Sequence, residues 1–229
     1  MNSLPYVYAA LLDVLGYREL LNRDIKRGAL NFKTTLQDAL ACLAEINDAE
    51  FAYQAISDTV IITCGDRSRF LEFLGVVKKV QLGFLSAGLF LRGGIAFQQH
   101  FRSGAVTYSP AFAAAYELET KTAIYPRVII DHNIIEMLES NGEASPIAES
   151  NLVCERNGIF FLNILDVDNW QSVYIQAKGV FVSDSKALFR NEAVFLKHLW
   201  FQDYVLSSPF ATKDCISYIP TIGIWKKQD

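Results

Sequence analysis

Residues 4 to 12 are almost all apolar, and this run constrains the fold more than any other stretch of the chain. It starts beside Pro5 and ends at Asp13, with Gly16 shortly after. An unbroken apolar run bounded by turn-forming residues is typical of a strand that is buried on both faces. We therefore expect a central strand of a sheet, with the Asp13 carboxylate at its end.

A tight hairpin is predicted further along the chain. Residues 51–56 and 59–64 are rich in strand-forming side chains, and only Ser57 and Asp58 separate them. A two-residue separation between two such runs predicts a β-hairpin. The carboxylate of Asp58 is then expected at its tip.

The predicted elements follow the order strand, helix, hairpin, helix, strand. Residues 19–46, interrupted at Gly28, and residues 67–83 have helical spacing, and residues 89–97 resemble a strand. This order is that of an α+β, ferredoxin-like or palm-type layer, with helices on one face of an antiparallel-rich sheet. The other face is expected to be available to a second subunit. The adjacent glycines Gly93 and Gly94 indicate close approach of another backbone or a ligand.

The polar stretch at residues 140–150 is the best candidate for an internal boundary. Residues 1–140 are predicted to form the catalytic domain. Residues 141–229 are predicted to be a C-terminal extension packed on the same domain. In it we expect strands near residues 152–154 and 159–164, and a helix near 191–206.

Charge and hydropathy exclude several classes of partner. The net charge of −4 offers no broad basic surface for a nucleic acid. No apolar run reaches the roughly 20 residues that a membrane helix needs. The start of the chain has no pattern of a secretion signal. We therefore expect a cytoplasmic protein that binds neither nucleic acid nor membrane.

The two predicted strand-end carboxylates, Asp13 and Asp58, belong to neighbouring strands in a palm-type sheet. Two carboxylates that lie close together repel unless a cation lies between them, and Mg²⁺ typically takes one or two carboxylates plus phosphate oxygens. The pair therefore predicts a triphosphate that is bound through a divalent ion, Mg²⁺ or Mn²⁺. Gly16 and Tyr17 open the following helix, and their backbone amides are expected to hold phosphates. The alternative is that Asp13 caps that helix and Asp58 is an ordinary turn residue.

Four segments, in order along the chain, resemble the class III adenylyl and guanylyl cyclases. Leu12-Asp13-Val14-Leu15-Gly16-Tyr17 resembles their first metal motif, and Ser57-Asp58-Thr59 falls at their second metal aspartate. Residues 91–96 resemble the strand after their second helix. Residues 109–119 fall at the helix that carries their transition-state residues. The resemblance extends over roughly residues 4 to 130.

The resemblance implies a cyclase that forms a 3′,5′-cyclic nucleotide and pyrophosphate from a triphosphate. It implies that Asp13 and Asp58 bind two divalent metal ions, with the Val14 carbonyl as a further ligand. It also implies a homodimer in which each active site is completed by the second subunit. The asparagine and arginine of the family's helix correspond to Ala113 and Glu117 here, so Arg92, Arg102 and Arg127 are candidates for the missing positive charge.

The positions that read a purine base in the family also differ. The lysine and aspartate of purine cyclases correspond to Gln54 and Val106. A glutamine amide can present either its oxygen or its NH₂ group to uracil or cytosine. This difference resembles the pyrimidine cyclases of bacterial Pycsar antiphage systems, which make cyclic UMP or cyclic CMP. We expect Tyr53 beside Gln54 to contact the base, with UTP slightly favoured over CTP.

Two other functions remain open. A degenerate cyclase-like domain would bind a nucleotide or a partner without turnover, as Ala113 and Glu117 suggest. A polymerase or diguanylate cyclase would share the two carboxylates. The hairpin, however, has Ile56-Ser57-Asp58-Thr59 instead of a Gly-Gly-Asp/Glu-Glu-Phe signature, and the chain has no basic template channel.

Overall fold

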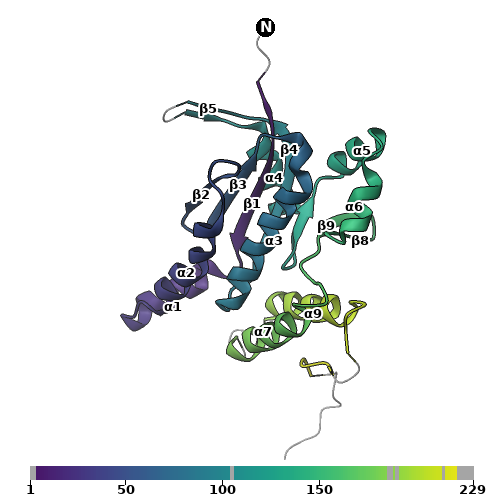
Figure 1. Ribbon diagram of the computed structural model, residues 1–229. Coiled ribbons are helices and arrows are strands. Elements are labelled where there is room, and N and C mark those ends of the chain that lie inside the picture. Colours follow the sequence, from purple (N-terminus) through teal and green to yellow (C-terminus); the bar gives the residue numbers. More distant parts are fainter. Residues whose placement is uncertain (1–3, 104–105, 185–187, 189–190, 213–214, 221–229) are drawn as a thin grey trace, which may run out of the picture. The chain divides into compact units, whose positions relative to one another are not determined.

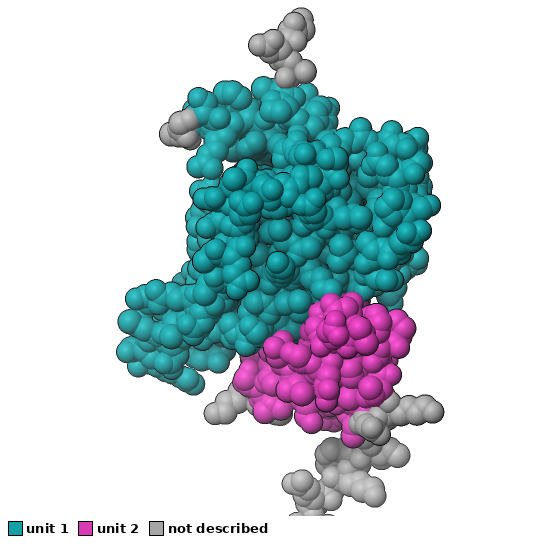
Figure 2. Space-filling model, viewed as in Figure 1, with its two compact units in different colours: residues 1–164 teal, residues 165–229 magenta. Residues whose placement is uncertain are grey.

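The computed structural model describes residues 4–103, 106–184, 188, 191–212 and 215–220. The chain forms two compact units, Met1–Ile164 and Leu165–Asp229 (Figure 2). The first unit extends beyond residue 140, the boundary predicted from sequence. The reason is that the next two strands hydrogen-bond into the sheet of the first unit instead of starting a new one.

The first unit is built on a seven-stranded sheet in the order β2-β3-β1-β4-β7-β9-β8 (Figure 1). Every neighbouring pair is antiparallel except β4 and β7, which run parallel. A separate two-stranded sheet, β5–β6, follows β4. This confirms the α+β class with a largely antiparallel sheet. The strands are β1 Tyr6–Val14, β2 Ala52–Ile56, β3 Thr59–Cys64, β4 Leu91–Gln99, β5 Phe101–Ser103, β6 Val106–Tyr108, β7 Val128–Ile130, β8 Val153–Arg156 and β9 Ile159–Leu162.

Helices lie on both faces of this sheet (Figure 1). On one face the ring of Tyr8 in β1 packs on Phe70 and Phe73 of α3. On the other face Val7 and Ala9 of the same strand pack against α4. The expectation of helices on one face only was wrong, because α4 returns across the second face. The helical segments of this unit are α1 Tyr17–Arg27, α2 Asn31–Leu40, η1 Ala41–Glu45, η2 Arg67–Arg69, α3 Phe70–Ser86, α4 Pro110–Lys121, α5 His132–Ser140 and α6 Ala144–Ser150.

The two adjacent glycines of β4 allow this close packing. A Cβ on Gly94 would lie 2.4 Å from the backbone oxygen of Ala115 in α4. A Cβ on Gly93 would lie 2.4 Å from the backbone oxygen of Leu11 in β1. Real Cβ atoms do not approach backbone oxygens this closely. The close approach predicted from sequence is therefore that of neighbouring backbone.

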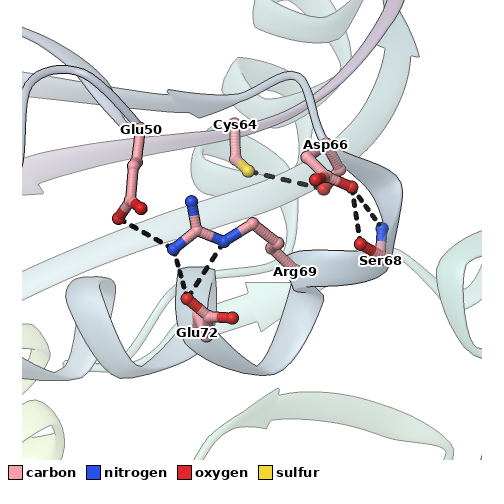
Figure 3. A network of polar contacts seen from close by, with 6 residues as sticks. All are labelled: Glu50, Cys64, Asp66, Ser68, Arg69 and Glu72. Carbon is pink, nitrogen blue, oxygen red and sulfur yellow. Dashed lines mark hydrogen bonds and ion pairs between the residues drawn. The ribbon is translucent and has the colours of Figure 1, made fainter.

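The β2–β3 hairpin is tied down at its open end by a network that we call the Arg69 clamp: Glu50, Arg69 and Glu72 (Figure 3). Arg69 Nη2 lies 2.8 Å from Glu50, which precedes β2, and also pairs with Glu72 in α3. The Arg69 guanidinium lies 4.9 Å from the ring centroid of Phe51. The clamp thus joins the segments before β2 and after β3, at the end of the hairpin opposite Asp58.

The second unit contains helices α7 (Trp170–Ser183) and α9 (Glu192–Leu206). The two helices are joined by a hydrogen bond from Trp170 Nε1 to the backbone oxygen of Val205, at 2.7 Å. The predicted C-terminal helix is present as α9, whereas α7 was not foreseen. Across the described part of the chain, none of the helices combines the length and the apolar character needed to cross a membrane.

Candidate metal and nucleotide site

Asp13 and Asp58 come together at one end of the central strands. Asp13 is the second-last residue of β1, directly opposite Thr59 of β3 on one side and Arg92 of β4 on the other. The N–H of Val14 donates a hydrogen bond to the backbone oxygen of Asp58 at 3.1 Å. Ser57, with φ of +59°, turns the chain at the hairpin tip. The convergence expected from sequence is therefore present in the fold.

Arg92 joins Asp13 to a third carboxylate, that of Glu119. Arg92 Nε donates to Asp13 Oδ2 at 3.3 Å, and Arg92 Nη2 lies 2.6 Å from Glu119 Oε1. The Glu119 oxygen lies off the axis of the Arg92 N–H bonds, so the contact is an ion pair without an aligned hydrogen bond. The side chain of Glu119 is 3% exposed, whereas that of Asp13 is 22% exposed. We call Asp13, Asp58, Arg92 and Glu119 the Arg92 cluster.

Negative charge exceeds positive charge in the Arg92 cluster. Burial raises the pKa of the Asp13 carboxyl above its ordinary value; Arg92 opposes the shift and the Asp58 charge adds to it. Burial also raises the pKa of Glu119, again against Arg92 and with the help of Asp13 and Asp58. One guanidinium thus does not neutralise three carboxylates, and an additional cation would lower the electrostatic energy of the cluster.

The donor atoms suit a hard divalent cation shared with a phosphate. Among the described residues no group of three or more His, Cys, Asp and Glu side chains is placed to hold a metal ion. Mg²⁺ does not require such a cage, because it is commonly bound by one or two carboxylates plus phosphate oxygens. The hydrogen bond from the Val14 N–H to the Asp58 carbonyl brings the backbone of Val14 beside Asp58. The residues present therefore fit the predicted site, in which divalent ions are bound by the protein and by a phosphate.

Gly16 and Tyr17 lie where β1 passes into α1. Gly16 is the N-cap of α1 and has φ of +79°, a conformation that glycine adopts at little cost. No side chain caps this helix end. The ring of Tyr17 packs edge-on against Phe32, with 5.3 Å between ring centroids. The first backbone amides of α1 are thus a few residues from Asp13, and the Tyr17 ring contributes to packing between α1 and α2.

Gln54 and Tyr53 lie on opposite faces of the hairpin. Gln54 is paired with Ile61, which is paired with Leu11, so Gln54 shares a face with Asp13. Tyr53 is paired with Ile62 and lies on the face of α3. Both residues are exposed. Since successive strand residues alternate between faces, only Gln54 is on the Asp13 side of the sheet.

The other residues considered from sequence lie as follows. Ala113 and Glu117 are exposed on α4, and Glu117 pairs with Lys121 on the same helix at 2.5 Å. The guanidinium of Arg127 is buried against the rings of Tyr125 and Phe161, at 5.7 and 5.5 Å from their centroids. Of the arginines proposed as a source of positive charge, Arg92 is the one that contacts Asp13.

Glu119 is a residue of the Arg92 cluster to which the sequence analysis gave no role. A signal for it was present in the sequence. Glu119 follows Ala111 and Ala115 at intervals of four residues, the spacing that places side chains on one face of a helix. All three are buried, with Ala111 and Ala115 fully so. A glutamate on the buried stripe of a helix requires a paired cation, and Arg92 is that cation.

Comparison with known proteins finds similarity to solved cyclase domains. The guanylate cyclase domain of RhGC from Catenaria anguillulae in complex with GTP has 10% identity and a TM-score of 0.43, over 71% of this chain and 98% of that one. A bacterial light-regulated adenylyl cyclase has 10% identity and a TM-score of 0.44, over 78% and 99%. The guanylyl cyclase Cya2 has 9% identity and a TM-score of 0.38, over 69% and 90%.

No protein-family model matches the chain. No curated protein matches it either. At the identities and TM-scores above, the structural matches assign neither a role to any residue of this chain nor a substrate to its site. The chemistry of the site rests on the Arg92 cluster itself.

Proposed function

We propose that this chain is a nucleotidyl cyclase that converts a pyrimidine ribonucleoside triphosphate, UTP ahead of CTP, into its 3′,5′-cyclic monophosphate and pyrophosphate. The observation that carries the proposal is the pairing of Asp13 and Asp58 at the ends of adjacent strands, with surplus negative charge. Such a pair is suited to two divalent ions, Mn²⁺ or Mg²⁺, that bring a triphosphate with them. The proposed biological role is a second messenger in antiphage defence.

In this reaction the ribose 3′-oxygen bonds to the α-phosphorus, the bond from that phosphorus to the bridging oxygen breaks, and pyrophosphate leaves with the electron pair. The hydroxyl proton passes to solvent. Divalent ions held by Asp13 and Asp58 would lower the pKa of the 3′-hydroxyl and balance charge on the phosphates. The contribution of the protein is then to position groups and to stabilise charge.

Individual residues have the following proposed roles. Asp13, Asp58 and the Val14 carbonyl bind the metal ions. The backbone amides at Gly16 and Tyr17 hold terminal phosphate oxygens. Arg92 is proposed as the catalytic cation at the phosphates.

Gln54 is proposed to read the pyrimidine edge, because it is exposed on the Asp13 face. The proposed base contact by Tyr53 has weaker support, since its ring lies on the other face of β2.

A second copy of the chain is proposed to complete each active site. Ala113 and Glu117 supply no positive charge for the departing pyrophosphate. Large apolar side chains are exposed on β2, on the β5–β6 sheet and on α4, and exposed apolar patches often mark protein interfaces. These side chains are Tyr53, Ile56, Phe101, Val106, Tyr108 and Tyr116.

The test is incubation of the protein with Mn²⁺ and each of the four ribonucleoside triphosphates, followed by mass spectrometry of the products. We expect cyclic UMP, with cyclic CMP next, and no cyclic product from Asp13→Asn or Asp58→Asn. Cyclic AMP or cyclic GMP as the main product would refute the pyrimidine assignment. Equal activity of either aspartate variant would refute the metal assignment.

Shared active sites are tested by mixing two inactive variants. A mixture of Asp13→Asn with Gln54→Ala regains activity if each site takes its aspartates from one subunit and Gln54 from the other. Activity that stays at the sum of the separate variants would place both residues in one subunit.

One observation favours a second function, a nucleotide-binding domain without turnover. Ala113 is apolar and Glu117 is an anion paired with Lys121, so neither of these α4 residues stabilises a pentavalent phosphate. Triphosphate binding with Mn²⁺ and no cyclic product from any of the four substrates would favour this function.

A further inference from the structure

We propose that Glu119 is a positioning residue that anchors Arg92 and thereby keeps the Asp13 carboxylate available to a divalent cation. The inference rests on the proposed metal site. In it, a buried residue of α4 determines how well that site binds the metal ion. Glu119 itself is not expected to touch the metal ion or the nucleotide.

The two contacts of Arg92 differ in length and in exposure to solvent. Its Nη2 lies 2.6 Å from Glu119, whereas its Nε lies 3.3 Å from Asp13. Glu119 is almost completely buried, and Asp13 is partly open to solvent. Ion pairs that are shielded from water are the stronger ones, so Glu119 is the anchor and Asp13 is the contact that can be released.

The position of Glu119 is fixed by backbone packing. The residue lies one turn beyond Ala115, whose backbone oxygen is packed against the site where Gly94 lacks a Cβ. Gly94 is two residues from Arg92 on the same strand. The distance between the Glu119 and Arg92 backbones is therefore set by the contact of α4 with β4, which leaves the carboxylate little freedom to move.

The charges of the Arg92 cluster explain why the anchor matters. Asp13, Asp58 and Glu119 carry three negative charges when ionised, and Arg92 carries one positive charge. The net charge of −2 would be balanced by one divalent cation. Without the Glu119 charge, Arg92 would be free to pair fully with Asp13 and to compete with the metal ion for it.

The experiment measures Mn²⁺ affinity by calorimetry and by electron paramagnetic resonance, in the absence of any reaction. Glu119→Gln keeps the size of the side chain and removes its charge, and we expect about tenfold weaker Mn²⁺ binding, as is typical for residues that orient a metal ligand. The matched control is Glu117→Gln, an exposed carboxylate of the same helix that pairs with Lys121; it is expected to bind Mn²⁺ like the wild type.

Two further variants test whether Glu119 acts through Arg92. Arg92→Gln removes the competitor for Asp13 and is expected to bind Mn²⁺ at least as tightly as the wild type. In the Arg92→Gln background, Glu119→Gln is expected to have no further effect. If Glu119→Gln fails to fold, the result for Arg92→Gln alone decides, because weaker Mn²⁺ binding by this folded variant would overturn the proposal.

The remaining outcomes are also decisive. Wild-type affinity in folded Glu119→Gln, or the same loss with and without Arg92, would overturn the positioning role. Mn²⁺ binding that depends on Glu119, together with no cyclic product from any triphosphate, would support this inference while refuting the cyclase function. A wild-type protein that binds no Mn²⁺ would overturn both.

Discussion

Two arginines of this chain each bridge two carboxylates, and their surroundings give the two networks opposite properties. In the Arg69 clamp, the carboxylates of Glu50 and Glu72 are well exposed, and hydrogen bonding by Arg69 lowers the pKa of Glu50. In the Arg92 cluster, burial raises the pKa of both carboxylates that Arg92 contacts. Both networks contain more carboxylates than guanidinium groups, but the carboxylates of the clamp are exposed to water, whereas those that Arg92 contacts are largely shielded from it.

The two networks lie at opposite ends of the β2–β3 hairpin. The clamp ties the open end of the hairpin to α3 (Figure 3). The other end carries Asp58 to the Arg92 cluster. We infer that the Arg69 clamp holds the open end of the hairpin in place. This fixes Asp58 at the tip, close to the other carboxylates of the Arg92 cluster, despite the repulsion between their charges.

The largest difference in stability is expected from removing each arginine. Arg92→Met leaves Glu119 buried and unpaired, and we expect a loss of about 3 kcal/mol in the free energy of unfolding at neutral pH. Arg69→Met leaves its two carboxylate partners, Glu50 and Glu72, exposed to water and is expected to have a much smaller effect. Urea denaturation of both variants measures the difference. Equal losses would remove the distinction between the networks.

A double variant sharpens that result. If the cost of Arg92→Met is that of an unpaired buried charge, adding Glu119→Leu should restore most of the lost stability, because apolar groups often replace buried ion pairs at little cost. Failure of Glu119→Leu to restore stability would mean that Arg92 stabilises the fold mainly through other contacts.

A smaller effect is expected from moving α4 away from β4. Gly94→Ala places a methyl group against the backbone of Ala115, and a loss of about 1–3 kcal/mol is expected from overpacking. The control is Gly75→Ala in α3, where a Cβ would meet nothing within 4 Å and where alanine is expected to stabilise the helix by about 0.5–1 kcal/mol. Thermal denaturation of both variants tests this, and a neutral Gly94→Ala would refute the close packing that positions Glu119.

The sequence predicted the hairpin and the end of the central strand because both signals are local. Asp13 follows an apolar run and Asp58 lies between two strand-forming runs, so each position can be found within ten residues. The adjacent glycines also predicted a close approach correctly, although the nature of the neighbour required the structure. These features together give the palm-type order of elements.

The features that escaped prediction depend on contacts far apart in sequence. The pairing of Arg92 with Asp13 joins residues 79 positions apart. Glu119 was missed because its burial follows from the path of α4 across the second face. Helix α7 was also missed. The placement of Tyr53 and Gln54 on opposite faces is different in kind, because it follows from the alternation of adjacent strand residues and could have been predicted from the sequence.

The smallest expected effect is that of pH on the metal-free protein. The folded state keeps protons on Asp13 and Glu119 to a higher pH than the unfolded chain does, so their contribution to stability is lost as pH rises through the raised pKa values. Glu50 behaves oppositely: its contribution is present above its ordinary pKa and is lost as pH falls through the lowered value. Carboxyl ¹³C titration by NMR should show Asp13 above and Glu50 below their ordinary values, and shifts in one common direction would refute the comparison.

The most direct test of the central claim is Mn²⁺ binding in the presence of a nonhydrolysable UTP analogue, measured by electron paramagnetic resonance. The wild-type protein is predicted to bind Mn²⁺, and Asp13→Asn and Asp58→Asn are predicted to lose that binding while remaining folded. Glu50→Gln, which removes a carboxylate of the Arg69 clamp, is predicted to keep it. Wild-type Mn²⁺ binding in either aspartate variant would contradict the account.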